Sequence, residues 1–321
     1  MTLAPLDERM RRRHKMRNRL QTWLLVAGSI ALLALCAFIF AGVEGILWAA
    51  AFGGVMLVVS LRASPWMVLK LYRARPLTEP AFPEGVRLLQ ELARRAELPA
   101  VPRLYYVPSR MMNAFAVGRP EDSAICITDG LLRGLTLRQF AGVLAHEVSH
   151  IRNGDIRVMA IADMVSRITG AMSTAGIVLL FLNLPFVMSG KAPVPWLGIA
   201  ILLAAPTIGA ILQLALSRAR EYDADLDAVG LTGDPEGLAA ALQTLERRQG
   251  RMWEMMLPGQ RIPDPSILRS HPRTEDRIAR LMSLRPGARP YVAAPDRRPE
   301  PPTRTVPVIR PPRFRTMGLW Y

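Results

Sequence analysis

Cysteine and histidine are scarce in this chain, whose 321 residues include two cysteines and four histidines. Cys36 lies within an apolar run, and Cys126 lies within a stretch whose composition is typical of a strand. Two cysteines placed in this way imply no disulfide framework and are compatible with a reducing compartment.

Acidic residues are also few, at 26 against 41 basic residues, and the resulting net charge of +15 is concentrated at the two ends. Residues 1–21 carry seven basic side chains against two acidic ones, and residues 285–321 carry eight arginines against two acidic residues. Nucleic-acid binding is the obvious interpretation of a basic protein, but this charge flanks an apolar run or lies among prolines. We therefore predict no nucleic-acid partner, and we expect disorder in the proline-rich tail.

Long apolar runs are what the chain has in abundance, with 50% hydrophobic residues and a mean hydropathy of +0.18. Three runs of 21 residues, at 23–43, 168–188 and 196–216, are each about 32 Å long as a helix and can cross a bilayer. A fourth run, at 46–61, is short at 16 residues and follows a turn expected at Glu44-Gly45. We predict four transmembrane helices, in two hairpins.

The apolar runs have two other interpretations. The first run could be a cleaved signal peptide, but its apolar core exceeds the usual length of about 7–15 residues and a second run follows at once, which favours a retained anchor. The runs at 168–188 and 196–216 could instead be buried core helices of a soluble fold.

Charge predicts the orientation of these spans. Basic residues gather at 9–19, 62–75 and 218–220, whereas the loops that join the paired runs hold Glu44 and Lys191 as their charged residues. By the positive-inside rule, both termini and the globular part lie in the cytoplasm. We expect six parts in order: a basic cytoplasmic N-terminus (1–21), a transmembrane hairpin (22–62), the first part of a cytoplasmic domain (63–167), a second hairpin (168–216), the second part of the domain (217–284) and the tail (285–321).

The globular part shows helix and strand patterns in turn. An amphipathic helix is predicted over 84–95, and three short strands over 103–107, 113–117 and 124–128 form a small sheet. A peptide could bind at the edge of such a sheet as an added strand. The candidate substrate-binding edge, with a plain core strand as the alternative, consists of Asn113, Ala114, Phe115 and Ala116.

The strongest chemical motif is the H-E-x-x-H stretch from His146 to His150. Thr136 and Gln139 form a capping-box pattern, and apolar residues follow at helical spacing, so a helix over 137–152 is predicted. The two histidines then share one face and can bind a single zinc ion, with Glu147 beside them as a general base for the hydrolysis of an amide bond. The alternative is a helix with two surface histidines.

A catalytic zinc takes three protein ligands and keeps one position for water, so a third ligand is required. Glu221 and Asp225 closely follow the run at 196–216 and are four residues apart on a predicted helix. One carboxylate could bind the metal while the other accepts a hydrogen bond from a ligating histidine, although a solvated acidic face is the alternative. Because Glu221 is only five residues past Leu216, the site is expected close to the membrane surface.

Four segments together carry a family resemblance. They are 113–118, 146–155, 217–225 and the group His271-Pro272 with Arg277, in that order among the apolar runs. In these segments the chain resembles the HtpX-type integral-membrane zinc metalloproteases, which are related to the endopeptidases that process CAAX prenylated proteins. The resemblance covers roughly residues 20–283, and it departs from the family at Arg273, where a second proline is usual.

The resemblance implies a mainly α membrane protein with a cytoplasmic α+β, gluzincin-like zinc metallopeptidase domain. It implies one zinc ion per subunit with His146, His150 and Glu221 as ligands, Glu147 as the base and Asp225 as the residue that orients a histidine. It also places His271 and Arg277 near the scissile carbonyl, where they could stabilise the oxyanion, and the 113–116 strand on the substrate backbone.

The implied enzyme is a metalloendopeptidase of the bacterial inner membrane that acts in quality control and stress response. Its partners would be the lipid bilayer and membrane-protein or unfolded polypeptide substrates, and it could cleave itself. A prenyl-protein-type endopeptidase is one alternative, which the four predicted spans count against. A membrane scaffold with a vestigial zinc site is another, which the intact Glu147 disfavours.

Overall fold

The structure is a computed structural model that describes residues 8–62, 65–189, 196–256, 272–284, 291–292 and 294–299. These residues are mostly helical and include one small sheet, as the sequence predicts. The helices are α1 (Glu8–Arg62), α2 (Pro65–Leu71), α3 (Pro83–Arg95), α4 (Asp129–Gly134), α5 (Leu137–Asn153), α6 (Asp155–Met188), α7 (Trp196–Thr232), α8 (Pro235–Met256) and α9 (Thr274–Met282). The strands are β1 (Arg75–Pro76), β2 (Arg103–Val107), β3 (Ala114–Arg119) and β4 (Asp122–Thr128).

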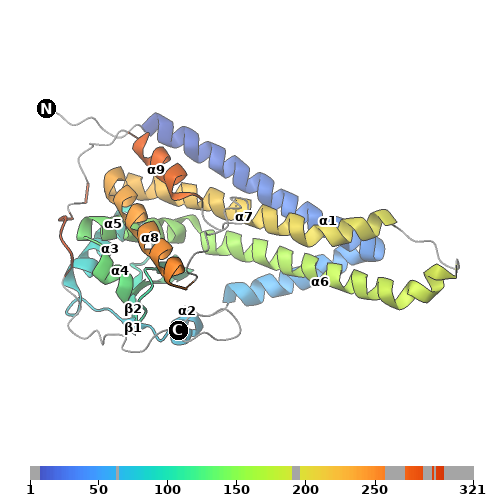
Figure 1. Cartoon of the computed structure of the whole chain (residues 1–321). Helices are drawn as coiled ribbons and strands as arrows, with labels where there is room; N and C mark the ends of the chain where they lie inside the picture. The colour runs from blue at the N-terminus through green and yellow to red at the C-terminus, as the bar shows by residue number, and fades with distance from the viewer. Residues whose placement is uncertain are drawn as a thin grey trace.

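Three of the described helices are long and apolar enough to cross a membrane: Arg12–Met56 within α1, Asp155–Leu182 within α6, and α7. Figure 1 shows these helices running side by side away from a smaller body that contains the sheet, α3, α4, α5 and α8. Large apolar side chains on them face outward, with Trp23 72% exposed and Leu197 76% exposed. Such an apolar outer surface is what a lipid-facing bundle presents.

The helix α1 is broken at Ala41 and Gly42, whose backbone angles are not helical. Gly42 has φ 61°, which a residue without Cβ adopts at little cost, and Gly45 lies so close to the carbonyl of Ala37 that a Cβ would be 2.2 Å from its oxygen. In Figure 1 the chain turns back beyond this break, in lighter blue, towards α2. The turn thus lies slightly before the expected Glu44-Gly45, and the count of four spans stays a prediction.

The sheet has the strand order β1-β2-β4-β3, with β2 parallel and β3 antiparallel to β4. The three strands predicted from the sequence are present, whereas the two-residue strand β1 is too short to leave a pattern. In β3, Ala114 and Ala116 pack on the main hydrophobic core, while Phe115 and Val117 pack on a smaller cluster on the other face of the sheet. The candidate substrate-binding strand is therefore the edge strand next to β4.

The helix α5 is the centre of the globular part. Thr136 and Gln139 form the predicted capping box, and Phe140, Leu144 and Val148 are fully buried along one face. Gly142 allows close approach of α8, because a Cβ at this position would lie 3.0 Å from Leu238 Cα. The helix is thus fixed along its whole length between the sheet, α7 and α8.

Part of the proline-rich tail binds the start of α5. The backbone N–H groups of Leu137 and Arg138 donate to the carbonyls of Arg297 and Pro295 at 2.7 and 3.2 Å, and Tyr291 N–H donates to Thr232 at 2.7 Å. The first N–H groups of a helix have no partner within the helix. Composition alone predicts disorder here because it cannot show that these donors need acceptors; residues 285–290, 293 and 300–321 lie outside the described part.

Removal of the tail contact is expected to destabilise the protein. We predict that a chain ending at Pro290 unfolds at least roughly 4–8 °C below a chain ending at Glu300, since the two bonds to the start of α5 alone contribute about 1 kcal/mol each. Circular dichroism of both chains in the same detergent measures the difference. Equal unfolding midpoints would show that the contact contributes nothing to stability.

Candidate metal centre

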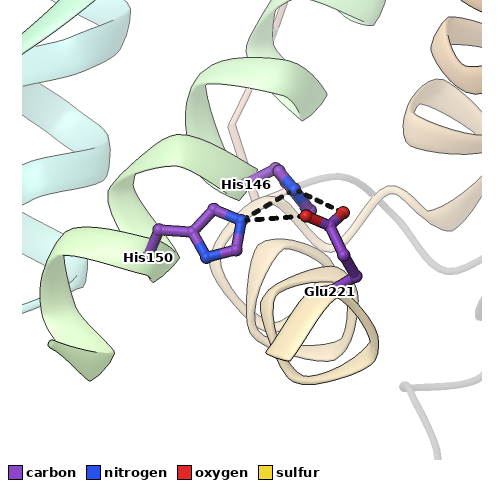
Figure 2. Close-up of side chains that lie close together, drawn as sticks. All are labelled: His146, His150 and Glu221. Carbon is purple, nitrogen blue, oxygen red and sulfur yellow. Dashed lines mark hydrogen bonds and ion pairs between the residues drawn. The ribbon is translucent and has the colours of Figure 1, made fainter. Parts of the chain in front are cut away.

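Two histidines and one carboxylate meet where α5 crosses α7. His146 Nε2 and His150 Nε2 lie 3.1 Å apart, and the carboxylate of Glu221 lies 3.5 Å from the first nitrogen and 3.8 Å from the second. Figure 2 shows the two rings and the carboxylate pointing toward one another from the two helices. The three ligand atoms all lie within 4.8 Å of each other, so these residues could hold one metal ion.

The other ring nitrogens face carboxylates. His150 Nδ1 hydrogen-bonds to Asp155 Oδ2 at 2.6 Å. His146 Nδ1 lies 3.1 Å from Asp225 Oδ1, close enough for an ion pair, although the angle is poor for a hydrogen bond. A carboxylate accepts only, so each Nδ1 carries the hydrogen and each Nε2 presents its lone pair. The two Nε2 atoms, 3.1 Å apart, can share one proton, or each can offer its lone pair to the same metal ion.

The electrostatics of the site also favour a cation. Burial disfavours the imidazolium form of His146, but Asp225 and Glu221 outweigh this effect and raise the pKa of His146 to about 10. The acidic groups thus stabilise a positive charge at this position, and a metal ion can take the place of the proton. The ligands would then be two neutral imidazole nitrogens and one carboxylate oxygen, a donor set that suits zinc. The residues therefore fit the metal that the sequence predicts.

Arg277 lies behind the metal-facing groups. Its Nε and Nη2 donate to the two oxygens of Asp225 at 2.7 and 2.6 Å, and its Nη1 lies 3.2 Å from Glu221 Oε2. Such a two-pronged contact fixes the plane of the carboxylate. The guanidinium is thus held by the acidic residues of α7, and both of those residues are oriented by it.

Asp155 is the site residue that sequence reasoning overlooked. Gly154 ends α5 with φ 67° and directs the chain so that the next residue returns its carboxylate to His150. The other oxygen of Asp155 accepts from Arg220 Nε at 2.6 Å. An aspartate directly after the glycine that ends a histidine-bearing helix was the available signal.

The candidate base, Glu147, is buried, with 8% of its surface exposed. It lies near the sheet, since burial and then the negative charge of Glu147 raise the pKa of Cys126 on β4 to about 12. The thiol of Cys126 is therefore protonated and unreactive at neutral pH. Glu147 thus lies next to His146 on α5, within electrostatic reach of strand β4.

The remaining predicted site residues lie at the edge of the sheet or outside the described part. Asn113 is exposed just before β3, and its backbone N–H donates to Thr128 Oγ1 at 2.9 Å. Residues 114–116 are half-buried in β3, which packs against α5. His271 lies outside the described residues, so the structure does not place it relative to the metal ligands.

Helices of membrane-spanning length and a largely buried His-His-Glu cluster that could hold a metal ion are the features expected of a membrane metalloprotease. The sequence profile described as Peptidase family M48 matches residues 82–285, which is more than half of the chain. The chain belongs to peptidase family M48.

Curated relatives support the family assignment and narrow it to HtpX-type proteases. "Protease HtpX homolog" of Burkholderia ambifaria (strain MC40-6) is 36% identical over 286 residues, covering 83% of this chain and 97% of the relative. The proteins of the same description from Burkholderia multivorans and Burkholderia lata are 36% and 35% identical, with the same coverage. The resemblance to HtpX-type proteases stated from the sequence is confirmed.

A solved structure shares the fold. The crystal structure of S. mikatae Ste24p matches with a TM-score of 0.50 at 20% identity, covering 83% of this chain. The chain spans 64% of the length of that protein, and at this identity the match shows the fold alone. Family, relatives and fold together support a metal-dependent integral membrane protease.

Asp155 offers a direct test of how the histidines are oriented. We predict that Asp155→Asn weakens zinc binding by roughly 10- to 100-fold, because an amide cannot replace the carboxylate that accepts from both His150 and Arg220. Competition with a chelator in detergent measures the affinity. Asp163→Asn, an exposed position on the same helix that pairs with Arg167, is the matched control and should leave zinc binding unchanged.

Proposed function

We propose that this protein is a zinc-dependent endopeptidase that hydrolyses peptide bonds of membrane proteins and misfolded proteins at the cytoplasmic face of the bacterial inner membrane, as part of protein quality control. The observation that carries the proposal is the convergence of two imidazole nitrogens and one carboxylate next to a further buried carboxylate, Glu147. A binding module or scaffold has no need of a general base beside its ligands. The family and the named relatives support the peptidase reaction.

The proposed ligands are His146, His150 and Glu221, which would hold one zinc ion per subunit. When bound, zinc lowers the pKa of a water molecule towards neutrality and polarises the carbonyl of the substrate. Asp225 and Asp155 fix the hydrogen on Nδ1 of the two histidines and thereby keep both Nε2 atoms available.

Glu147 is proposed as the general base. Its carboxylate would take the proton of the attacking water and deliver it to the nitrogen of the departing amine. Its burial next to His146 keeps bulk water away from this transfer and strengthens its electrostatic effect on the reacting groups.

For Arg277, the contacts support a positioning role. The guanidinium is bound to Asp225 and lies close to Glu221, so it would keep the third ligand in place while the substrate binds. The contact of Arg277 and His271 with the oxyanion remains a prediction from the resemblance.

The substrate is proposed to bind as a strand along β3. Among the described strands, β3 pairs only with β4, and its residues Ala114 to Ala116 lie beside the helix that carries the histidines. A strand added at this edge would bring a peptide bond past Glu147 through backbone hydrogen bonds, which do not depend on the side chains of the substrate. Such a mode suits an enzyme that acts on many unfolded chains.

The metal centre is proposed to lie close to the membrane on its cytoplasmic side, with both chain termini on that side. Glu221 follows the apolar part of α7 by about 8 Å of helix, and Arg19 and Arg152 are exposed outside the apolar runs. Substrates would therefore be juxtamembrane loops or damaged membrane proteins. The division of the chain into two hairpins and a two-part domain is part of this proposal.

The reaction is tested with Glu147→Gln. We expect the variant to bind one zinc ion like the parent but to cleave an unfolded casein-like substrate, and itself, roughly 10²- to 10⁴-fold more slowly, since only the base is lost. Both proteins are purified in detergent without metal, and cleavage is followed after zinc is added. Glu246→Gln, at an exposed position on α8, is the control. Equal cleavage by Glu147→Gln and the parent would refute the assigned role.

The orientation is tested by labelling single cysteines in a chain that carries Cys36→Ala and Cys126→Ser. We predict that Glu44→Cys and Lys191→Cys react with a membrane-impermeant maleimide in intact spheroplasts, whereas Arg298→Cys reacts only after permeabilisation. The reverse pattern would place the metal centre outside the cytoplasm. Labelling of Glu44→Cys and Arg298→Cys from the same side would contradict the first hairpin.

A further inference from the structure

The first turns of α1 reach the acidic part of α7. Asn18 is only 1% exposed, and its Nδ2 donates to Asp223 Oδ1 at 3.0 Å. One turn earlier, Lys15 Nζ donates to both oxygens of Asp227 at 2.7 and 2.9 Å. Neither Asn18 nor Lys15 contacts a candidate metal ligand, and both contacts are polar, unlike the packing of the apolar bundle. A role for these two contacts therefore has to be sought elsewhere.

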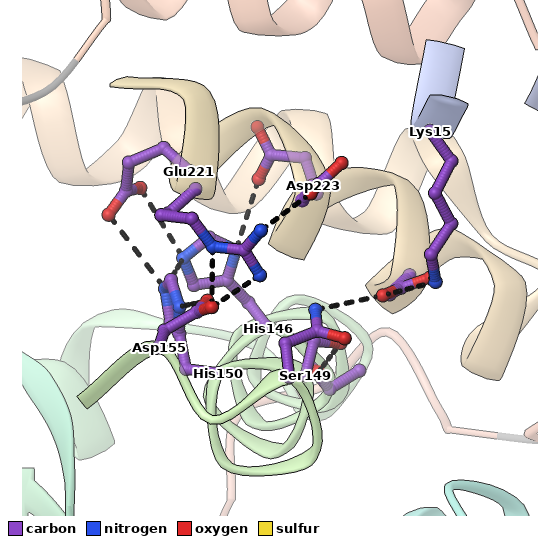
Figure 3. Close-up of polar contacts among 12 residues, drawn as sticks. Lys15, His146, Ser149, His150, Asp155, Glu221 and Asp223 are labelled. Carbon is purple, nitrogen blue, oxygen red and sulfur yellow. Dashed lines mark hydrogen bonds and ion pairs between the residues drawn. The ribbon is translucent and has the colours of Figure 1, made fainter. Parts of the chain in front are cut away.

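A continuous series of hydrogen bonds leads from Asn18 to a metal ligand. The second oxygen of Asp223 accepts from Arg220 Nη1 at 2.9 Å. Arg220 Nε donates to Asp155 Oδ1 at 2.6 Å, and Asp155 Oδ2 bonds to His150 Nδ1 at 2.6 Å. Figure 3 shows Asp155 beside His150, with Asp223 farther along the same network.

The groups between the two ends are buried, with Asp223 2%, Asp155 3% and Arg220 8% exposed. In such surroundings a carboxylate oxygen that loses its donor is costly, and each bond in a series strengthens its neighbours. Arg220 is shared between Asp155 and Asp223. If Asn18 no longer satisfies Asp223, the shared guanidinium is drawn towards Asp223 and away from the carboxylate that orients His150.

The contact of Lys15 strengthens the same arrangement. Asp227 accepts from Lys15 and also, at 2.9 Å, from Asn153 Nδ2 at the end of α5. The carboxylate therefore ties α1 to both helices that carry metal ligands. Without its partners, Asp227 would repel Asp223, which lies one turn away on the same helix.

We propose that Asn18 is a positioning residue of the metal centre, acting through Asp223, Arg220 and Asp155 on the orientation of His150, with Lys15 as a second support. The inference rests on the proposed function in one respect, that His150 binds zinc. The N-terminal helix α1 then helps to orient a metal ligand, in addition to anchoring the chain in the membrane. A contact that served packing alone would affect the stability of the fold but not the affinity of the folded protein for zinc.

The experiment compares Asn18→Leu with Gln21→Leu in the full chain. Gln21 is exposed on the same helix one turn further on, so the control makes the same kind of change without touching the network. Both carry Glu147→Gln to prevent self-cleavage. We expect Asn18→Leu to bind zinc about three- to tenfold more weakly, less than the loss on removing a direct partner of a ligand, and Gln21→Leu to bind like the parent.

Zinc affinity is measured by chelator competition, and unfolding midpoints are measured at saturating zinc. Equal zinc affinities for Asn18→Leu and Gln21→Leu would overturn the proposal, whatever the midpoints. If Asn18→Leu does not fold, Lys15→Met against the exposed Arg19→Met replaces the pair, with a loss of about threefold expected for Lys15→Met alone.

Measurements on the parent chain distinguish a failure of this inference from a failure of the proposed function. A parent chain, with Glu147 intact, that binds one zinc ion but cleaves nothing would refute the peptidase, while the comparison of zinc affinities would still decide the role of Asn18. A parent that binds no zinc would overturn both.

Discussion

Each histidine of the metal centre has a carboxylate behind it, and the rest of the structure depends on keeping these two pairs in place. Asp155 and Asp225 come from α6 and α7, and neither belongs to the helix that carries the histidines. A buried aspartate needs its own partner, which Arg220 supplies to the first and Arg277 to the second. The packing of these helices is therefore set by charge as much as by apolar contact.

The two arginines act differently. Arg277, on the short helix α9, contacts both Asp225 and Glu221 of α7. It thereby holds the two carboxylates of α7 in place. Arg220 bridges α6 and α7, and it transmits the position of one helix to the other. A charge that is shared in this way allows little movement, because any shift that favours one carboxylate weakens the bond to the other.

Local pattern made much of this structure predictable. The capping box at Thr136 and the apolar spacing that follows it define α5 within one residue, and strand β2 begins and ends where its composition indicates. The shared face of His146 and His150 also follows from their spacing. These features depend on residues a few positions apart, whose preferences act in isolation as they do in the fold.

The features that could not be predicted depend on residues far apart in the chain. The bond between Arg220 and Asp155 joins positions 65 residues apart, and that between Asn18 and Asp223 joins positions 205 residues apart. Likewise, the composition of residues 294–299 indicates a mobile segment because it contains no trace of the helix start to which that segment binds. In each case the missing information was the position of the partner.

The helix α6 and the first part of α7 separate the two histidines from Glu221 in the sequence, yet the fold brings the three residues together in space. During synthesis the two histidines are therefore made well before Glu221. Glu221 reaches them only when α6 and α7 have folded back against each other. For a protease this order has a useful result. A chain whose long helices have not yet folded against each other carries no complete His-His-Glu cluster, so the proposed metal centre forms only together with the membrane-spanning part of the protein.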